Sequence, residues 1–376
     1  MSAACASEAG SGSPGEREGD ASPPSASASA PSPSGTPSDL PPAKGSVKVV
    51  STLTEGLASP WGLAALPGGD LLVASRDDAT ITLIDGESGK KTLLGSVPGV
   101  SPGGEGGLLG LAVSSTFGAD RLVYAYFTTE SDNRIARMLY EERKPAGQQL
   151  GAPDTILRGI PKGSIHNGGR IAFGPDRMLY AGTGETGDTG LAQDKESLGG
   201  KILRMTPDGE PVHGNPEADS VVYSYGHRNV QGLAWDGQKR LWAAEFGQNT
   251  WDELNRIEPG GNYGWPEVEG EQGEKGFIDP VAQWKTEDAS PSGIAFADGS
   301  IWMAGLRGER LWRIPLSGTS EDEPLAAPQS FLDGEYGRLR TVLAAGEDRL
   351  WLVTSNTDGR GSPKQGDDRI VLLEVR

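Results

Sequence analysis

The sequence predicts an all-β fold, a six-bladed β-propeller that follows a disordered N-terminal tether. Three observations support this prediction. An apolar strand, a tight turn and a second apolar strand recur six times, successive copies lie 48 to 62 residues apart, and both ends of the repeating region are strand-like. A spacing that suits four short strands, repeated six times, is typical of a propeller with six blades.

The first 44 residues consist almost wholly of Ser, Ala, Pro, Gly and a few acids. Such a segment buries too little apolar surface to offset chain entropy, so residues 1–44 are expected to form a disordered tether. The only cysteine, Cys5, follows small residues as in a bacterial lipoprotein signal, but no hydrophobic stretch precedes it. Two interpretations stay open: a lipid anchor on the outer face of the membrane, if the signal is missing from this sequence, or an incidental thiol.

The remaining residues, 45–376, are expected to form a single propeller domain. Short runs of alternating apolar residues, bounded by Gly, Pro, Asp and Asn, suit sheets stacked around an axis. The segments 46–51 and 369–375 are expected to share one blade, which would hide two sheet edges. The six strand pairs are 61–65 with 70–74, 109–113 with 121–125, 170–173 with 178–181, 231–235 with 240–244, 292–296 with 300–304, and 340–344 with 349–353.

The charge balance limits the partners. The 376 residues carry 52 acidic and 34 basic side chains, a net charge of -18, and the sequence has no run of cations. This balance argues against nucleic acid and against binding to an anionic membrane surface. No apolar run reaches transmembrane length, so membrane attachment would be through a lipid at Cys5 alone. A single cysteine excludes a disulfide framework and a c-type haem.

One histidine interrupts the repeat. His166 lies directly before the Gly168-Gly169 turn that leads into an apolar strand, and no other copy carries a histidine there. Repeats supply packing, and departures from them supply sites. A neutral imidazole could act as a general base near neutral pH. The alternative is a turn histidine bonded to backbone.

Cationic residues precede or follow several repeat strands. Arg228 and Asn229 are adjacent, Arg307 follows a strand, and the alternation of Arg338 and Arg340 places both guanidinium groups on one side of an extended segment. Guanidinium groups clamp carboxylates, so these arginines could form a pocket for a polyanionic small molecule. Structural ion pairs or solvated turns are the alternatives.

Two further segments carry polar residues. Residues 245–255 and 260–266 combine carboxylates, amides and turn glycines that free backbone carbonyls, which are the oxygen ligands that calcium prefers. An acidic surface loop is the alternative. The Gly-rich segment 103–110 has Glu105 as its only functional side chain and lacks the spacing of a phosphate loop, so it is a weak nucleotide signal.

Together these segments resemble the soluble PQQ-dependent glucose and aldose sugar dehydrogenases, the glucose/sorbosone dehydrogenase family. The likeness covers nearly all of the chain after the tether and is most specific at residues 166–170, 224–229, 253–255 and 261–266. It implies a six-bladed propeller that acts outside the cytoplasm. It also implies an oxidoreductase that oxidises aldose sugars at C1 to lactones, with hydride transfer to PQQ and electrons passed to an external acceptor.

The resemblance also implies a role for each site residue. His166 would be the general base. The carbonyls of Gly247 and Gln248 would bind the calcium ion that polarises PQQ, and Glu253 with the Tyr263 carbonyl would belong to a second, structural calcium site. The residues implied to bind the cofactor are Glu105, Arg228, Asn229, Arg307, Arg338 and Arg340.

The sequence departs from the family pattern around this site. Glu105 stands where the family usually has Gln, and a carboxylate there is expected to repel a trianionic cofactor unless it is protonated or metal-bound. Arg307 replaces a lysine. Thr341 replaces an aspartate, and Ile165 precedes His166 where some members have Asp, which leaves the imidazole without an orienting carboxylate in the sequence nearby.

Two other functions remain open. A calcium-dependent propeller lactonase would need a cage of Glu, Asn and Asp side chains on the axis and no arginine clamp. A non-enzymatic propeller would bind a glycan or a protein and carry an eroded cofactor site. Reconstitution with PQQ and calcium distinguishes the three, because only the dehydrogenase would then reduce a dye with aldoses.

Overall fold

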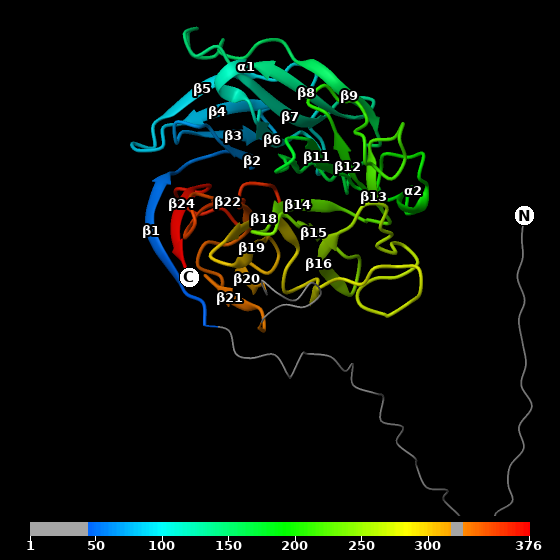
Figure 1. The fold of residues 1–376 in the computed structure, drawn as a ribbon. Helices are drawn as coiled ribbons and strands as arrows, with labels where there is room; N and C mark the ends of the chain where they lie inside the picture. Colours follow the sequence, from blue (N-terminus) through cyan, green and yellow to red (C-terminus); the bar gives the residue numbers. More distant parts are fainter. Residues whose placement is uncertain (1–43, 317–325) are drawn as a thin grey trace, which may run out of the picture. The chain divides into compact units, whose positions relative to one another are not determined.

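The computed structural model describes residues 44–316 and 326–376. The predicted tether, except for its last residue, and Cys5 lie outside the described residues. Within them the chain forms six antiparallel sheets of four strands each, and Figure 1 shows these sheets arranged around a common axis. The predicted six-bladed β-propeller is confirmed.

The inner half of each blade is the predicted strand pair. The first strands, which line the axis, are β2 (Pro60–Ala65), β6 (Leu108–Val113), β10 (Ile171–Phe173), β14 (Val230–Trp235), β18 (Pro291–Ala297) and β22 (Leu339–Ala344). The second strands are β3 (Leu71–Ser75), β7 (Leu122–Thr128), β11 (Leu179–Gly182), β15 (Leu241–Glu245), β19 (Ser300–Gly305) and β23 (Arg349–Thr354). All six predicted pairs occur.

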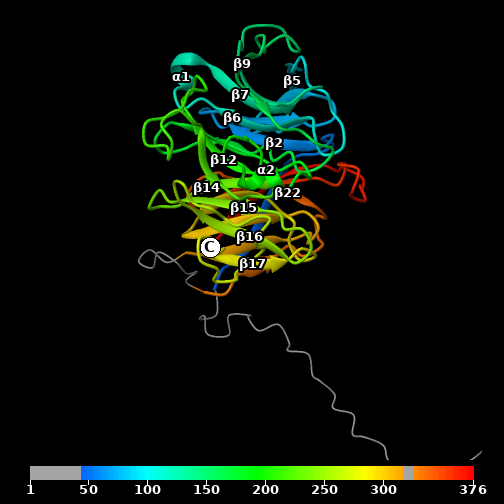
Figure 2. The ribbon, with the colours of Figure 1, turned by 90° about the vertical axis from the view of Figure 1, so that its right-hand side faces the viewer.

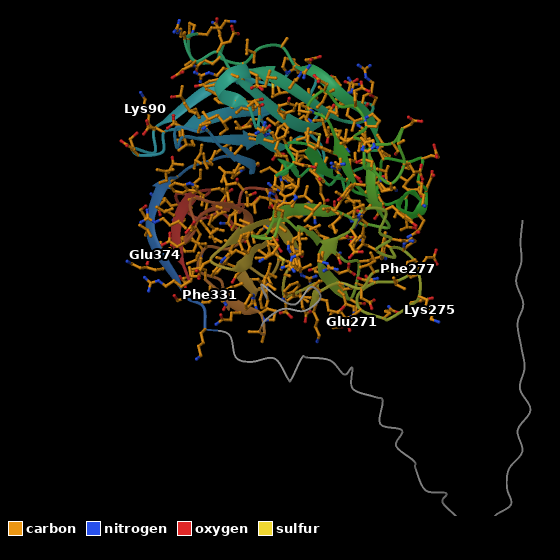
Figure 3. The ribbon with its side chains drawn as sticks, viewed as in Figure 1. Lys90, Glu271, Lys275, Phe277, Phe331 and Glu374 are labelled. Atoms are coloured by element: carbon orange, nitrogen blue, oxygen red, sulfur yellow. The ribbon has the colours of Figure 1, made fainter. Side chains whose placement is uncertain are left out.

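Two more strands complete each blade toward the rim. The third strands are β4 (Thr80–Ile84), β8 (Asn133–Leu139), β12 (Lys201–Met205), β16 (Trp251–Ile257), β20 (Leu311–Pro315) and β24 (Ile370–Val375). The outermost strands are β5 (Lys91–Ser96), β9 (Asp154–Ile160), β13 (Val222–Tyr225), β17 (Ala282–Lys285), β21 (Gln329–Phe331) and β1 (Val47–Thr54). Exposed charged side chains such as Lys90, Glu271 and Lys275 lie at the periphery (Figure 3).

The two ends of the propeller close the ring in one blade. Strand β1 pairs antiparallel with β24, so that Val47 lies opposite Val375 and Thr54 opposite Ile370. Figure 1 shows these two strands side by side, in blue and red. Each first strand also packs against the first strand of the next blade, and β22 packs against β2. In the closed ring every first strand therefore packs against the first strands of both neighbouring blades.

Apolar side chains fill the space between neighbouring blades. One cluster joins Leu63, Leu71 and Val73 of the β2 blade to Val353 and Ile370 of the β22 blade. Burying each such side chain is worth about 1.5–3 kcal/mol. Because these contacts cross the closure between the first and last blades, they help the strand pairing to hold the ring shut.

The described residues contain two short helices, α1 (Phe117–Asp120) and α2 (Gly190–Gln193). No helix among these residues is long and apolar enough to span a membrane. Figure 1 shows α2 at the right-hand edge of the ring near β13, and Figure 2 shows the same helix from that side, facing the viewer. The buried ammonium of Lys201 donates to the carbonyls of Leu191, Ala192 and Gly199 at 2.6, 3.0 and 2.7 Å. This side chain therefore ties α2 to the third strand of its blade.

Lys201 is expected to be the main anchor of the α2 loop. Lys201→Met should lower the free energy of unfolding by about 2 kcal/mol, because the substitution leaves buried carbonyls without donors. The same loop accepts backbone hydrogen bonds from Gly226 and His227, directly before Arg228. Chemical denaturation checks the prediction, with the exposed Lys90→Met as the matched control. Equal stability of the two variants would contradict it.

Candidate active site

Two sets of loops meet at one end of the propeller axis. The loops that precede the first strands carry Glu105, His166 and Arg228, and the turns that follow the second strands carry Gly247 and Arg307. Together they surround a cavity of about 350 Å³. Because this loop pattern repeats in every blade, residues far apart in the sequence converge on the same space.

The cavity gathers most of the predicted site residues. Its lining includes His166, Glu105, Arg228, Asn229, Arg307, Arg338, Arg340, Gly247 and Gln248. Two predicted residues, Glu253 and Tyr263, are absent from the lining and lie buried in the β16 blade and in the loop that follows it. The resemblance assigned these two to a separate metal site, and their place in the structure is compatible with that assignment.

His166 is held at the cavity wall in a fixed orientation. Its backbone has a positive φ of 52°, and the following Gly168 has a φ of 61°. A Cβ on Gly168 would lie 2.5 Å from the carbonyl oxygen of Gly182, so only glycine fits this turn. The Nδ1 atom of His166 lies 2.7 Å from Oε1 of Glu185, and Nε2 lies 3.0 Å from Nη2 of Arg228.

Glu185 was not predicted, and it supplies the orienting carboxylate that the sequence around His166 lacks. Its side chain is only 1% exposed. A buried carboxylate bonded to Nδ1 favours the tautomer with a proton on Nδ1, which leaves Nε2 as the acceptor. The expectation of an unoriented imidazole, drawn from Ile165, is therefore wrong, because the partner comes from the next turn of the same blade.

Glu105 also has a partner that the sequence did not reveal. Its Oε1 lies 2.7 Å from Nη2 of Arg360, and its Oε2 accepts the backbone N–H of His166 at 2.9 Å. The expectation that Glu105 must be protonated or metal-bound to tolerate an anion is therefore corrected. An arginine 255 residues further along the chain neutralises it instead.

The predicted pair Arg338 and Arg340 shares one carboxylate. Asp358 Oδ2 lies 2.9 Å from Nη2 of Arg338 and 3.2 Å from Nη2 of Arg340. Burial lowers the pKa of Arg340 to about 10, which still leaves it protonated at neutral pH. The pKa of Asp358 is lowered because the two guanidinium charges outweigh its burial. Arg340 therefore remains cationic, and both guanidinium groups line the cavity with donors to spare.

Two other arginines of the lining have free donors. The Nε of Arg228 is buried without a hydrogen-bond partner, although Nη1 donates to the carbonyl of Phe246 at 3.2 Å. Burial lowers the pKa of Arg228, and nearby carboxylates, first among them Glu185, oppose this. Arg307 is exposed and makes no hydrogen bond or ion pair with the residues that the structure describes. These donors are available to an anion that enters the cavity.

The loop with Gly247 and Gln248 presents free carbonyls. Oε1 of Glu269 accepts the backbone N–H groups of four consecutive residues, from Gln248 to Trp251, at 2.7 to 3.2 Å. This turns the N–H groups toward Glu269. The carbonyl oxygens of Gly247 and Gln248 accept no hydrogen bond from a described residue. A hard cation could use such carbonyls as ligands.

Beside the buried Glu253, one amide oxygen accepts no hydrogen bond from the described residues. Its carboxylate accepts the N–H of Gly270 at 2.7 Å and a side-chain bond from Asn255 at 3.0 Å. Burial and the charge of Glu245 raise the pKa of Glu253. The Oδ1 atom of Asn255 is buried without a partner. No group of three or more His, Cys, Asp or Glu side chains that could hold a metal occurs in the described part of the chain, so a cation here would need amide or carbonyl oxygens.

Thr341 has a structural role. Its buried hydroxyl donates to the carbonyl of Trp61 at 2.9 Å and accepts a hydrogen bond from Arg170 at 3.1 Å. A threonine can bridge these two groups, but it brings no negative charge. The guanidinium of Arg170 therefore lies beside a neutral partner.

The sequence analysis missed several cavity residues. Besides Glu185, which supports His166, the missed lining residues include Arg76, Asp358 and Arg360. One signal could have found them: each follows the second strand of its blade within six residues, as do Gly247 and Arg307. The turn after every second strand points to the same end of the axis, so any charged residue there is a candidate.

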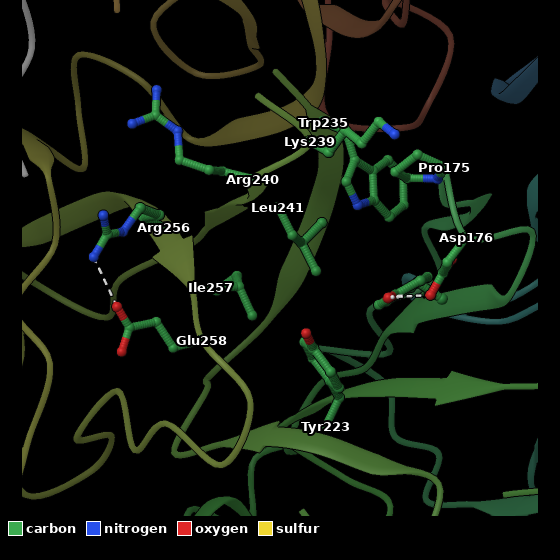
Figure 4. A pocket seen from close by; sticks show the side chains of 11 residues that line it. Pro175, Asp176, Tyr223, Trp235, Lys239, Arg240, Leu241, Arg256, Ile257 and Glu258 are labelled. Atoms are coloured by element: carbon green, nitrogen blue, oxygen red, sulfur yellow. Dashed lines mark hydrogen bonds and ion pairs between the residues drawn. The ribbon is translucent and has the colours of Figure 1, made fainter. Parts of the chain in front are cut away.

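A larger cavity lies elsewhere. It has a volume of about 560 Å³ and is lined by Tyr180, Tyr223 and Trp235 together with charged side chains (Figure 4). Asp176 pairs with Tyr180 there, and Glu258 with Arg256. None of the predicted site residues lines this cavity. We therefore place the candidate active site in the smaller axial cavity, where the unrepeated residues meet.

Comparison with known proteins gives a consistent picture. The sequence model of the family described as Glucose / Sorbosone dehydrogenase matches residues 57–365. The chain is 31% identical to the aldose sugar dehydrogenase YliI of Escherichia coli (strain K12) over 341 residues, which span 82% of this chain and 91% of that protein. It is 30% identical to quinoprotein glucose dehydrogenase B of Acinetobacter calcoaceticus over 300 residues, 70% of this chain and 63% of that protein.

A solved structure is similar over most of the chain. The PQQ-bound form of aldose sugar dehydrogenase from Streptomyces coelicolor superposes with a TM-score of 0.88 at 73% sequence identity. The superposition covers 89% of this chain and 100% of that one. The likeness therefore includes the propeller and the loops that form the axial cavity.

Proposed function

This chain belongs to the glucose/sorbosone dehydrogenase family, and from that premise we propose that it oxidises aldose sugars at C1 to lactones with PQQ and calcium. As a member of this family it is an oxidoreductase that acts on sugar CH–OH groups. The axial cavity is the proposed site of the reaction. The finer points, namely the lactone product, calcium and the route of the electrons, are proposals argued from the residues below.

The charge of the cavity is the observation that carries the proposal. Among the described residues that line it, six arginines face three carboxylates, which gives a net charge of +3 at neutral pH in a chain whose net charge is -18. PQQ is a tricarboxylate. A volume of about 350 Å³ lies within the range of about 300–1,000 Å³ that holds such ligands. The cavity therefore fits PQQ in both charge and size.

We propose that Gly247 and Gln248 hold a calcium ion beside PQQ. Their carbonyls are free, and the loop that carries them is fixed by Glu269. A second calcium ion would lie near Glu253, Asn255 and the Tyr263 carbonyl, where the unpartnered Oδ1 of Asn255 leaves a buried acceptor. Both sets of ligands consist of carbonyl, amide or carboxylate oxygens, which a hard cation prefers.

When bound, PQQ supplies the two-electron acceptor, and calcium favours negative charge on it. His166 supplies the base. Its Nε2 faces the cavity and, with Nδ1 protonated against Glu185, can take the proton of the C1 hydroxyl as C1 loses its hydride. The Nη2 of Arg228 lies 3.0 Å from that Nε2, so the guanidinium would have to release the imidazole before Nε2 could accept a proton.

The remaining residues bind and orient. Three arginines offer donors to carboxylates of the cofactor, namely Arg307, Arg338 and Arg340. Asp358 forms ion pairs with Arg338 and Arg340 and so fixes their positions. Arg360 cancels the charge of Glu105, whose Oε2 in turn fixes the backbone of His166. We further propose that the electrons leave to an external acceptor and that the protein works outside the cytoplasm, with a lipid attached at Cys5.

Reconstitution tests the proposal. Purified protein loaded with PQQ and calcium should reduce a dye when aldoses are added, and the sugar product should be the C1 lactone. Removing calcium with EGTA should abolish the activity, and adding calcium back should restore it. Lactone hydrolysis without PQQ would support the lactonase alternative, and no uptake of PQQ would overturn the proposal.

Glu185 is expected to act as a positioning residue. Glu185→Gln should lower kcat by about 10- to 100-fold, because the amide holds the imidazole less firmly than the carboxylate does. The affinity for PQQ should stay unchanged, because Glu185 does not line the cavity. Steady-state kinetics and PQQ titration check this, and Glu185→Asp should restore part of kcat. A loss of PQQ affinity equal to the loss of kcat would indicate a structural role only.

A further inference from the structure

The other end of the propeller axis carries a second opening. It has a volume of about 270 Å³, and its wall contains one aliphatic residue from the first strand of each blade. These are Leu63, Leu111, Ile171, Leu233, Ile294 and Val342. We call this opening the axial vestibule. The active-site cavity lies at the starts of the first strands and the vestibule toward their ends, so the two open on opposite faces of the ring.

The position before each aliphatic residue is glycine in four blades: Gly62, Gly110, Gly232 and Gly293. A Cβ at Gly62 would lie 2.4 Å from the carbonyl oxygen of Leu109, so the first strands approach too closely there for a side chain. The β10 blade breaks this rule with Arg170, and the β22 blade with Thr341. Arg170 is therefore a large charged residue at a position where four of the six blades have glycine, and the packing of the blades does not explain it.

Arg170 reaches across the axis to other blades. Its Nε donates to the carbonyl of Gln231 at 2.7 Å, its Nη2 donates to Thr341 Oγ1 at 3.1 Å, and its guanidinium stacks 4.4 Å above the ring of Trp61. The residue is 7% exposed and lines the vestibule. Its partners Gln231 and Trp61 line the active-site cavity, whereas Thr341 lines the vestibule, so Arg170 lies between the two.

The charge of Arg170 is not balanced. Its contacts are a carbonyl, a hydroxyl and an aromatic ring, and no carboxylate among the described residues forms an ion pair with it. Burial, together with the positive charge of Arg340, lowers the pKa of Arg170 to about 9. The remaining nitrogen, Nη1, donates to no described residue. A buried cation without a counterion costs free energy unless an anion joins it.

We propose that the axial vestibule binds a monocarboxylate with a short aliphatic tail, its carboxylate against Arg170 and its tail against the ring of six aliphatic residues. The guanidinium supplies the planar donors that a carboxylate prefers over a spherical ion. The apolar wall and the volume of about 270 Å³ favour a tail, because one small inorganic ion would leave most of the space unfilled. This site is independent of the proposed sugar oxidation.

Calorimetry on the full chain loaded with PQQ and calcium tests the proposal, with acetate, butyrate, hexanoate and sodium chloride as probes and hexanol as the neutral control. Affinity should rise about fourfold for each added methylene until the vestibule is filled. Chloride and hexanol should bind more weakly than hexanoate. An affinity that does not depend on chain length, or no binding at all, would overturn the proposal.

Variants locate the binding. Thr341→Asp places a carboxylate beside Nη2 of Arg170 and should abolish hexanoate binding, whereas the neutral Thr341→Asn should retain it. If Thr341→Asp fails to fold, Ala172→Phe fills the vestibule and should abolish binding with Arg170 intact. Arg307→Gln removes a cation from the other cavity and should leave hexanoate affinity unchanged. Binding that survives Thr341→Asp or Ala172→Phe, or that is lost in Arg307→Gln, would contradict the assignment.

Discussion

Replacing His166 by Asn is expected to lower kcat by about 10²- to 10⁴-fold, the usual contribution of a positioned general base. The side chain lines the axial cavity, and Glu185 directs its Nε2 toward the space where a sugar hydroxyl would lie. Asparagine is smaller and neutral and cannot take up the proton. Steady-state rates of dye reduction at saturating aldose measure the effect.

The controls separate a lost base from a lost site. PQQ titration should give nearly the same affinity for His166→Asn as for the unchanged protein, because the arginines that bind the carboxylates remain. His213 is exposed in a distant loop, and His213→Asn should leave kcat unchanged. If His166→Asn retained the full kcat, another group would have to be the base.

Arg338→Gln and Arg340→Gln are each expected to weaken PQQ binding by about 10- to 100-fold, because a hydrogen bond to a charged group is worth about 1.5–3 kcal/mol. Each variant also lowers the positive charge of the cavity, while the other arginine keeps Asp358 paired. Following the absorbance of PQQ during titration into the calcium-loaded protein measures the dissociation constant.

The matched control for these arginines is Arg177→Gln. Arg177 is exposed in the turn between β10 and β11, outside the lining of the cavity. The Arg177→Gln substitution removes one positive charge, as each of the two cavity variants does, so any effect of net charge appears in all three. PQQ affinity that fell equally in Arg177→Gln would show that net charge, and not the cavity, determines binding.

The fold could be predicted from the sequence because the propeller repeats. Each blade contributes the same apolar pair of strands, so a weak local signal becomes strong when it is found six times. The equivalent residues Leu63, Leu111 and Ile171 lie in one ring around the axis, together with their counterparts in the other blades. The pairing of the terminal strands β1 and β24 was also predictable, because both ends of the repeating region are strand-like and a closed ring needs them in one blade.

The candidate site could be predicted only in part. His166, Arg228 and Arg307 interrupt the repeat beside a strand, so the sequence marks them. The pairing of Glu105 with Arg360 joins residues 255 positions apart, and nothing local indicates it. The sequence also has no run of cations, yet the closed ring brings six arginines of the described chain to one cavity. This cluster of positive charge forms because the propeller topology brings loops of different blades together, and it cannot be seen in the order of the residues.

Glu185 illustrates the same limit. It follows β11 in a short turn and resembles an ordinary surface acid in the sequence, but the fold buries it against His166.

Arg170 gives no separate signal in the sequence, because it directly precedes Ile171 in the predicted strand. Its isolation from carboxylates becomes visible only when the neighbouring blades are placed around it.

A crystal structure of the protein reconstituted with PQQ and calcium tests the central claim most directly. We expect density for one PQQ in the axial cavity, with its carboxylates within hydrogen-bonding distance of Arg338 and Arg340 and a cation on the carbonyls of Gly247 and Gln248. His166 Nε2 should face the quinone across the space for a sugar. PQQ bound elsewhere on the propeller, with the arginine cluster still paired only to Asp358 and Glu105, would contradict the account.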